Sequence, residues 1–164
     1  MQINNRLRYF RMSMRYNKVR PVEFGLQVST SDPRLYIAPE DGSRWEKRRL
    51  YDFGWGPEVG FVRLPKLEFE DLWELLLNSG VEENRYGAAA IILMDYPDLL
   101  LEQVESAMRQ GDIGQQFRSA LDILELDKAI NWTDPTEKTP EDVREDYRRW
   151  SEVAAWTKGL SPST

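Results

Sequence analysis

The sequence contains no cysteine and no histidine among its 164 residues. Without cysteine the chain forms no disulfide, has no thiol nucleophile and builds no zinc site on thiolates. Histidine is the commonest general base and metal ligand, so its absence excludes Ser-His-Asp and Cys-His catalysis. An enzyme made from this chain would have to use carboxylates, Lys, Arg, Tyr or Ser. We therefore expect a protein that is not an enzyme, with no catalytic residue, no cofactor and no metal ion.

Long apolar runs are also absent. The longest, residues 88–94, is far shorter than the roughly 20 residues that span a bilayer, so we expect no membrane segment. The N-terminus is rich in Arg and has no acidic residue before Glu23, as in mitochondrial presequences. Its Arg and apolar residues alternate with period two, however, and Ser13 is its only Ser or Thr. We therefore expect a cytoplasmic protein.

Charge is divided unevenly along the chain, whose net charge is −6. Residues 1–65 hold 12 Lys and Arg against 7 Asp and Glu, whereas residues 66–164 hold 10 against 21. Such an asymmetry says more about partners than about fold. It predicts an Arg- and aromatic-rich N-terminal part followed by an acidic part.

Residues 5–65 show period-two alternation interrupted by turn signals. Phe24, Leu26 and Val28 alternate with polar or small residues, and residues 29–33 and 39–42 combine Ser, Asp, Pro and Gly in the manner of turns. The pattern predicts four to five short strands in one antiparallel sheet. The candidate strands are residues 6–9 or 10–16, 23–28, 35–37, 45–53 and 59–64.

After Pro65 the apolar period changes to 3.6, which predicts about five helices. Their beginnings and ends carry helix signals such as Pro at the first position and Gly after the last. The first and fourth helices are predicted from apolar stripes whose first members are Phe69 and Ile113. The second is predicted from about Glu82 to Asp95, the third from Pro97 until Gly111, and the last opens at Thr139 and Pro140. Because strands and helices are segregated, the fold class is predicted as α+β: an N-terminal antiparallel sheet packed on a C-terminal helical bundle. We expect a single domain over residues 1–164, with a β-rich basic part (1–65), a helical acidic part (66–158) and a frayed tail (159–164).

Two clusters of carboxylates are the leading candidate site. A field of one sign speeds the encounter with an oppositely charged protein, so we interpret them as a surface for a basic protein partner. The simpler structural interpretation is a solvated helix face, in which Glu145 pairs with Arg148 or Arg149. A Mg²⁺ or Ca²⁺ site is disfavoured because no Asp-x-Asp-x-Asp-Gly loop is present. The candidate residues are Glu70, Asp71 and Glu74 on the first helix, and Glu141, Asp142, Glu145 and Asp146 on the last.

The basic N-terminal part offers a rival interpretation. Arg side chains that alternate with aromatic residues on a sheet can pair with phosphates and stack on bases, as Arg8, Tyr9 and Phe10 would. The simpler interpretation places the aromatic rings in the core and pairs the arginines with the acidic half. Trp55, between two glycines, is either a binding anchor or a lid that folds back over the sheet.

No motif of a known family is present in these residues. The leading hypothesis is a non-catalytic cytosolic protein-binding module, of the inhibitor or immunity-protein type, that engages a basic partner through its acidic helical surface. The alternative is a nucleic-acid or nucleotide-binding module that uses the N-terminal sheet. A carboxylate-based enzyme ranks third, and the sequence specifies no oligomeric state.

Overall fold

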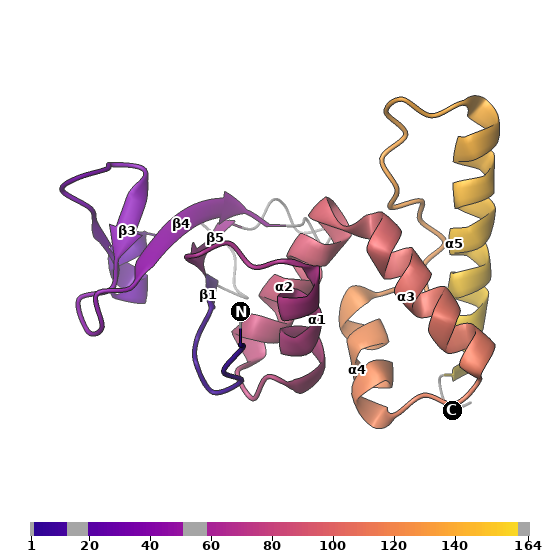
Figure 1. Cartoon of the computed structure of the whole chain (residues 1–164), viewed down its shortest axis with the longest axis horizontal. Helices are drawn as coiled ribbons and strands as arrows, with labels where there is room; N and C mark the ends of the chain where they lie inside the picture. Colours follow the sequence, from indigo (N-terminus) through magenta and orange to yellow (C-terminus); the bar gives the residue numbers. More distant parts are fainter. Residues whose placement is uncertain (1, 13–19, 51–58, 161–164) are drawn as a thin grey trace. The chain divides into compact units, whose positions relative to one another are not determined.

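The protein consists of an N-terminal antiparallel sheet followed by five α-helices (Figure 1), which confirms the predicted α+β class. The structure is a computed structural model that describes residues 2–12, 20–50 and 59–160. The chain divides into two compact units, residues 1–91 and residues 92–164. We call them the sheet unit and the helical unit. The expectation of a single domain stays a prediction.

The sheet has five strands in the order β1-β5-β4-β3-β2, and all neighbours are antiparallel. The tight turn between β3 and β4 closes with a hydrogen bond from the Gly42 amide to the Ala38 carbonyl (2.8 Å), and Gly42 has the positive φ (69°) that favours glycine. The short helix η1 (Pro21–Phe24) precedes β2. The strands are β1 (Phe10–Met12), β2 (Gln27–Val28), β3 (Leu35–Ile37), β4 (Arg44–Arg49) and β5 (Val59–Arg63).

Aromatic side chains form the core on one face of this sheet. Trp45 and Phe61 are fully buried there, and the rings of Phe24 and Tyr36 meet the ring of Phe61 edge-on at centroid distances of 5.7 and 5.0 Å. The guanidinium of Arg11 lies 4.5 Å from the centroid of the Trp45 ring, a favourable cation–π distance. The aromatic residues of β3, β4 and β5 therefore face the core, as the simpler interpretation predicts.

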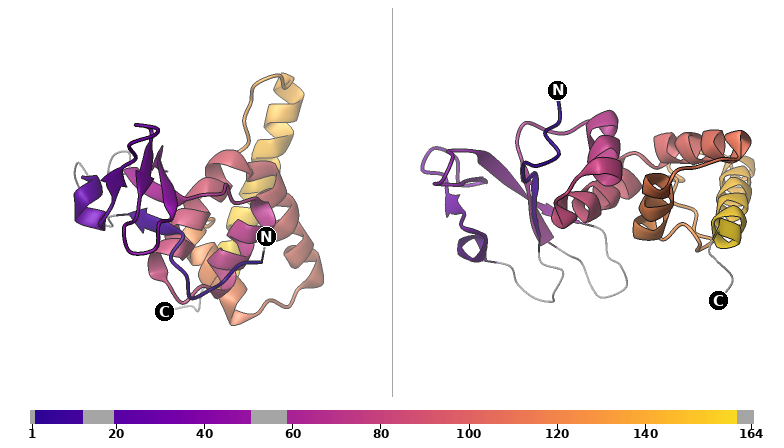
Figure 2. Two further views of the ribbon diagram at one scale, coloured as in Figure 1. Left: turned by 60° about the vertical axis from the view of Figure 1, so that its left-hand side comes forward. Right: turned by 90° about the horizontal axis from the view of Figure 1, so that it is seen from below.

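Two helices complete the sheet unit: α1 (Phe69–Asn78) and α2 (Glu82–Asp95), whose first ten residues belong to this unit. They lie at the β1 end of the sheet (Figures 1 and 2). The approach is close at Gly87, where an added Cβ would stand 2.2 Å from the Phe10 ring. Glycine at this position lets α2 pack directly on β1.

A buried asparagine of α2 hydrogen-bonds the N-terminal segment of residues 7–10. Asn84 is fully buried, and its Oδ1 accepts hydrogen bonds from the Tyr9 amide (2.8 Å) and the Phe10 amide (3.2 Å). Its Nδ2 donates to the Leu7 carbonyl (2.8 Å) and to Ser79 Oγ (2.9 Å). The buried amide thus has both of its polar atoms satisfied, which offsets the cost of removing them from water.

The helical unit contains α3 (Pro97–Gln110), α4 (Gln115–Leu124) and α5 (Pro140–Leu160). At the start of α5 the Asp142 amide donates to Thr139 Oγ1 (3.2 Å) and Asp142 Oδ2 accepts from the Thr139 amide (3.0 Å), which confirms the predicted start. The fourth helix begins at Gln115, two residues after Ile113, the first residue of its predicted apolar stripe, because Gly114 is extended at the N-cap position. The last helix continues through Leu160, two residues into the predicted tail, and residues 161–164 lie outside the described residues.

Among the helices that the structure describes, none has both the length and the apolar character needed to cross a membrane.

Candidate partner-binding surface

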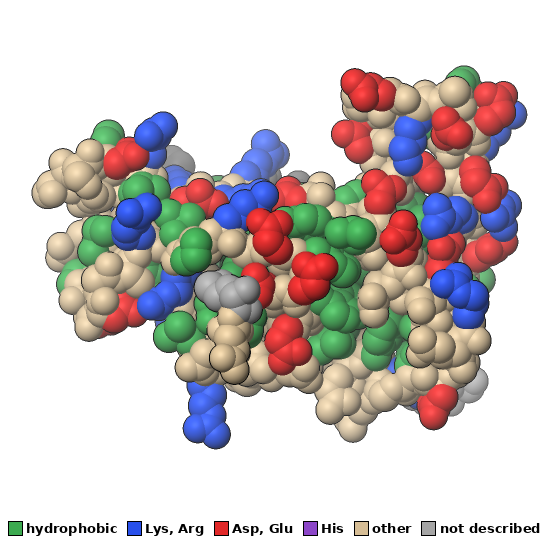
Figure 3. Space-filling view, in the orientation of Figure 1, with side chains coloured by type: hydrophobic (Ala, Val, Ile, Leu, Met, Phe, Trp, Pro, Cys, Tyr) green, Lys and Arg blue, Asp and Glu red, His purple; other side chains and the backbone are tan. Residues whose placement is uncertain are grey.

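The outer face of α5 carries a ladder of paired charges. Glu145 accepts hydrogen bonds from Nε (2.8 Å) and Nη2 (2.6 Å) of Arg148, which also pairs with Glu152. One turn earlier, Glu141 lies 3.8 Å from the guanidinium of Arg144. Acidic and basic side chains accordingly alternate over α5 in Figure 3. The face has mixed charge, so the predicted acidic surface is neutralised along its own helix.

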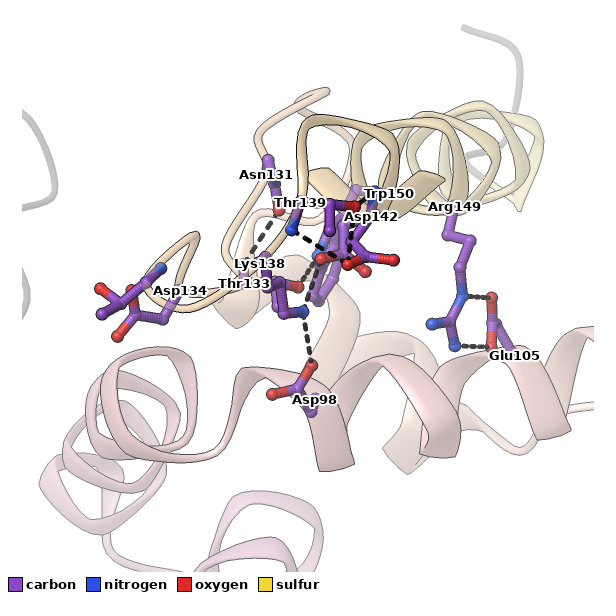
Figure 4. Close-up of polar contacts among 12 residues, drawn as sticks. Asp98, Glu105, Asn131, Thr133, Asp134, Lys138, Thr139, Asp142, Arg149 and Trp150 are labelled. Carbon is purple, nitrogen blue, oxygen red and sulfur yellow. Dashed lines mark hydrogen bonds and ion pairs between the residues drawn. The ribbon is translucent and has the colours of Figure 1, made fainter. Parts of the chain in front are cut away.

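The other two predicted residues of α5 have structural roles. Asp142 caps the helix, and Asp146 is buried. Asp146 Oδ2 accepts a hydrogen bond of 2.6 Å from Lys138 Nζ, and the same Nζ lies 3.8 Å from Asp98 on α3 (Figure 4). The hydrogen bond with Asp146 raises the pKa of Lys138, so this lysine is protonated at neutral pH and unsuited to act as a nucleophile.

The loop before α5 is held by further polar contacts. The indole Nε1 of Trp150 donates to Thr133 Oγ1 (2.9 Å), and the Thr133 amide donates to Asn131 Oδ1 (3.1 Å). Both Thr133 and Trp150 are buried. These contacts and the Lys138 pair in Figure 4 attach the loop to the inner side of α5. The network stabilises the helical unit and leaves few of its polar atoms for a partner.

The predicted residues of α1 lie in the sheet unit, and two of the three have structural roles. Glu74 accepts hydrogen bonds from Asn5 Nδ2 (2.7 Å) and Asn78 Nδ2 (2.9 Å). Asp71 belongs to the capping box at the start of α1, and Glu70 is exposed. The carboxylates of α1 and those of α5 therefore belong to different units and form no single cluster within either one.

Trp55, the predicted anchor or lid, lies outside the described residues.

Where the pKa of a described side chain is shifted, the shift favours the charged form: carboxyl pKa values are lowered, and those of Lys and Arg are raised. The hydrogen bond from Arg34 lowers the pKa of Asp32 to about 2, and the hydrogen bond from Arg149 lowers the pKa of Glu105. A general acid at neutral pH needs a carboxyl pKa that is raised instead. In the part of the chain that the structure describes, no three acidic side chains lie close enough together to hold a metal ion. These groups are arranged for ion pairs and helix caps.

The net charges of the two structural units differ from those of the two parts of the sequence, 1–65 and 66–164, because the unit boundary lies at residue 91. The sheet unit has 14 Lys and Arg against 13 Asp and Glu, whereas the helical unit has 8 against 15. The sheet unit is nearly neutral because the acidic residues of α1 and α2 offset its arginines. Arg8, for example, pairs with Glu83 of α2 at 3.4 Å. The surplus negative charge belongs to the helical unit.

One exposed surface of the helical unit combines carboxylates with apolar side chains. Leu99 is 41 % exposed and Met94 is 37 % exposed. The sequence has no Lys or Arg between Arg85 and Arg109, so no cation of their own helices interrupts this stretch. We define the α3 patch as the exposed residues at the end of α2 and the start of α3: Met94, Asp95, Asp98, Leu99 and Glu102.

The sequence-based prediction missed the α3 patch because it followed the apolar stripe of this helix, which identifies the buried residues. The gap in cations from residue 86 to residue 108 was the available signal. A long stretch whose only charges are negative indicates a negatively charged surface when its carboxylates are exposed.

Comparison with known proteins found no matching family model, no similar curated protein and no similar solved structure. The side-chain geometry and the distribution of charge are therefore the basis for the functional proposal.

Proposed function

We propose that this chain is a non-catalytic protein-binding module that engages a basic protein through the α3 patch. The observation that carries the proposal is the exposure of Met94 and Leu99 among carboxylates that no basic residue of α2 or α3 separates. Burying apolar surface in an interface contributes about 25 cal/mol per Å² before the costs of association. Carboxylates around the apolar side chains raise the encounter rate with a basic partner and disfavour acidic ones.

The proposed partner surface lies on α3 and not on the carboxylates of α1 and α5 that the sequence predicted. On α5 the arginines of the outer face pair with Glu141, Glu145 and Glu152, which cancels most of the field there. On α3, Asp98 lies 3.8 Å from Lys138, whose nearer partner is Asp146 at 2.6 Å. Glu102, one turn further along, is exposed. The field available to a partner is therefore stronger over α3.

An inhibitor or immunity-type protein is the class that suits these properties. A basic toxin, such as a nuclease, presents the positive surface that the α3 patch would complement. The cysteine-free sequence suits a reducing cytosol, where an inhibitor would protect the cell that makes the toxin. This assignment to a class rests on charge and size, by analogy.

The two other hypotheses receive less support from the structure. A base-stacking platform on the sheet needs exposed rings, whereas Phe10, Trp45 and Phe61 are fully buried. A carboxylate-based enzyme would need a carboxyl with a raised pKa. Among the described residues, each carboxyl whose pKa is shifted has it lowered.

The proposal is tested with three forms of the tagged chain as bait in a lysate of its source cells. The forms are the wild type, the patch variant L99S/E102K and the control variant Y147S/E141K. The control makes the same two kinds of change on α5, where Tyr147 is 53 % exposed and Glu141 is exposed. Captured proteins are identified by mass spectrometry, and their binding is then measured with the purified partner.

We expect the wild type and the control to capture the same basic protein and the patch variant to lose it at least tenfold. The association rate should fall as salt rises, because the steering is electrostatic. Capture of no basic protein, equal capture by the patch variant, or loss in the control alone would contradict the proposal.

A further inference from the structure

Strand β4 carries cations that are not used in ion pairs among the described residues. Three arginines of the sheet unit are paired with acidic residues of its turns: Arg11 with Glu40, Arg34 with Asp32 and Arg63 with Asp41. Lys47 and Arg49 are exposed instead, as is Arg44 at the start of the strand. Three of the six residues of β4 thus present positive charge to solvent.

Lys47 and Arg49 point to the same face of the sheet, because they are two residues apart on one strand. Their Cα atoms are therefore about 7 Å apart. Their direct neighbours on β5 are Phe61 and Val59, which carry no charge. Glu46, the acidic residue of β4, pairs with Val62 and lies on the opposite face.

The pairing of β3 with β4 ends at Glu46, which lies opposite Leu35. Residues 47–49 of β4 extend beyond that point, so β3 does not cover the flank of the strand that carries Lys47 and Arg49. A ligand can approach these two side chains from the sheet face and from this flank without displacing a described strand.

The chemistry of the strand favours a polyanion over an acidic protein. Stable protein interfaces are centred on buried apolar or aromatic anchors. Trp45, the aromatic residue of β4, is fully buried, and the exposed valines of this unit, Val22 and Val28, lie on η1 and β2. Cations spaced along an extended strand, without an apolar anchor, suit the phosphates of a nucleic-acid backbone.

We propose that Lys47 and Arg49 of β4 bind the phosphate backbone of nucleic acids without reading the bases. Among the described residues of this face, Trp45 and Phe61 lie in the core and Tyr36 packs against it, so we assign the affinity to phosphate contacts. The near-neutral sheet unit does not oppose the approach of a polyanion as the helical unit would. This site is separate from the α3 patch and does not depend on the proposed protein partner.

The test is fluorescence anisotropy with labelled single-stranded DNA, single-stranded RNA and duplex DNA of about 20 nucleotides, longer than the site of one small domain. Each nucleic acid is used in two base sequences, and labelled heparin is a further polyanion. Affinity is measured over a series of salt concentrations. The site variants are K47E/R49E and K47Q/R49Q, and circular dichroism verifies that each is folded. The control is R6E/R118E, which changes the net charge as much as K47E/R49E does at two exposed arginines on other elements.

We expect the wild type to bind more weakly as salt rises. A plot of the logarithm of the association constant against the logarithm of the salt concentration should have a slope as steep as or steeper than about −1.4 for single strands and −1.8 for duplex, the values for two phosphate contacts. K47E/R49E should weaken binding more than tenfold, and K47Q/R49Q should bring the slope near zero. The R6E/R118E control should stay within about twofold of the wild type, and L99S/E102K should bind as the wild type does.

Four results would overturn the inference. They are no anisotropy change at low salt, equal weakening in the R6E/R118E control, binding of heparin but of no nucleic acid, and affinities that differ more than tenfold between base sequences of the same length. If K47E/R49E does not fold, K47Q/R49Q decides the question, because it removes the charge without reversing it.

Discussion

Arg149 of α5 and Glu105 of α3 form a two-pronged ion pair, in which Nε donates to Oε1 (2.8 Å) and Nη2 to Oε2 (2.6 Å). This geometry is the strongest that the two side chains can adopt. Both are partly shielded from solvent, with exposed side-chain fractions of 30 % and 22 %. The pair joins two helices of the helical unit 44 residues apart in sequence.

Replacing Glu105 with Gln should lower the free energy of unfolding by about 1 kcal/mol at pH 7, the upper range for a partly exposed pair. Because Arg149 holds the folded-state pKa of Glu105 below 4.5, the pair stabilises the protein above the unfolded-state value and loses this effect as pH falls through the folded-state value. The difference between E105Q and wild type should therefore shrink in acid. Urea denaturation at pH 7 and below pH 4.5 measures this difference in the free energy of unfolding, and E102Q is the control. A difference that does not change with pH would argue against a stabilising ion pair.

Replacing Asn84 with Ala should destabilise the sheet unit by about 3 kcal/mol. The substitution leaves the Tyr9 and Phe10 amides and the Leu7 carbonyl without their partner in a buried site. Urea denaturation measures the loss, and hydrogen exchange should show faster exchange at the Tyr9 and Phe10 amides. Asn78→Ala, which removes an exposed hydrogen bond to Glu74, is the matched control and should cost under about 0.5 kcal/mol.

Replacing Gly87 with Ala should lower the free energy of unfolding by about 2 kcal/mol. Overpacking against the Phe10 ring costs more than the roughly 1 kcal/mol that alanine contributes to a helix. Shortening the obstructing side chain in G87A/F10L should recover part of this loss in thermal denaturation. Gly159→Ala on α5 meets nothing within 4 Å and should leave stability unchanged or raise it. A neutral G87A would mean that α2 does not pack closely on β1.

Replacing Lys138 with Met should cost about 3 kcal/mol, because it leaves the Asp146 carboxylate, with 10 % of its side chain exposed, without its cation. The double variant K138M/D146N also removes the uncompensated charge of Asp146 and should recover at least half of the lost free energy of unfolding. Chemical denaturation of both variants provides the comparison. A double variant less stable than K138M would contradict this account, in which the uncompensated charge is the main cost.

The boundaries of the second and third helices followed from local signals in the sequence. The second helix was predicted from Glu82 to Asp95 and spans those residues, and the third was predicted to begin at Pro97 and end before Gly111, as it does. Proline at the first position, glycine after the last and the apolar period act over a few residues, so they are readable without tertiary structure.

The partners of individual polar residues did not follow from such signals. Glu145 was expected to pair with Arg148 or Arg149; it pairs with Arg148, while Arg149 turns toward Glu105 of another helix. The partner of Asp146 is Lys138 in the preceding loop. These choices depend on which helix face meets which element. For the same reason the sequence did not show that most of the carboxylates predicted as a partner surface on α1 and α5 are paired or capping.

The position of Asn84 also has a consequence for synthesis of the chain. Its hydrogen bond to the Tyr9 amide spans 75 residues, and the ladder partners of β1 are in β5. As β1 leaves the ribosome, it therefore has none of its ladder or Asn84 partners until β5 and the first turns of α2 have been translated. This unit can close only after the chain has been translated through the first turns of α2, which makes its folding a collective event that follows the synthesis of all its strands.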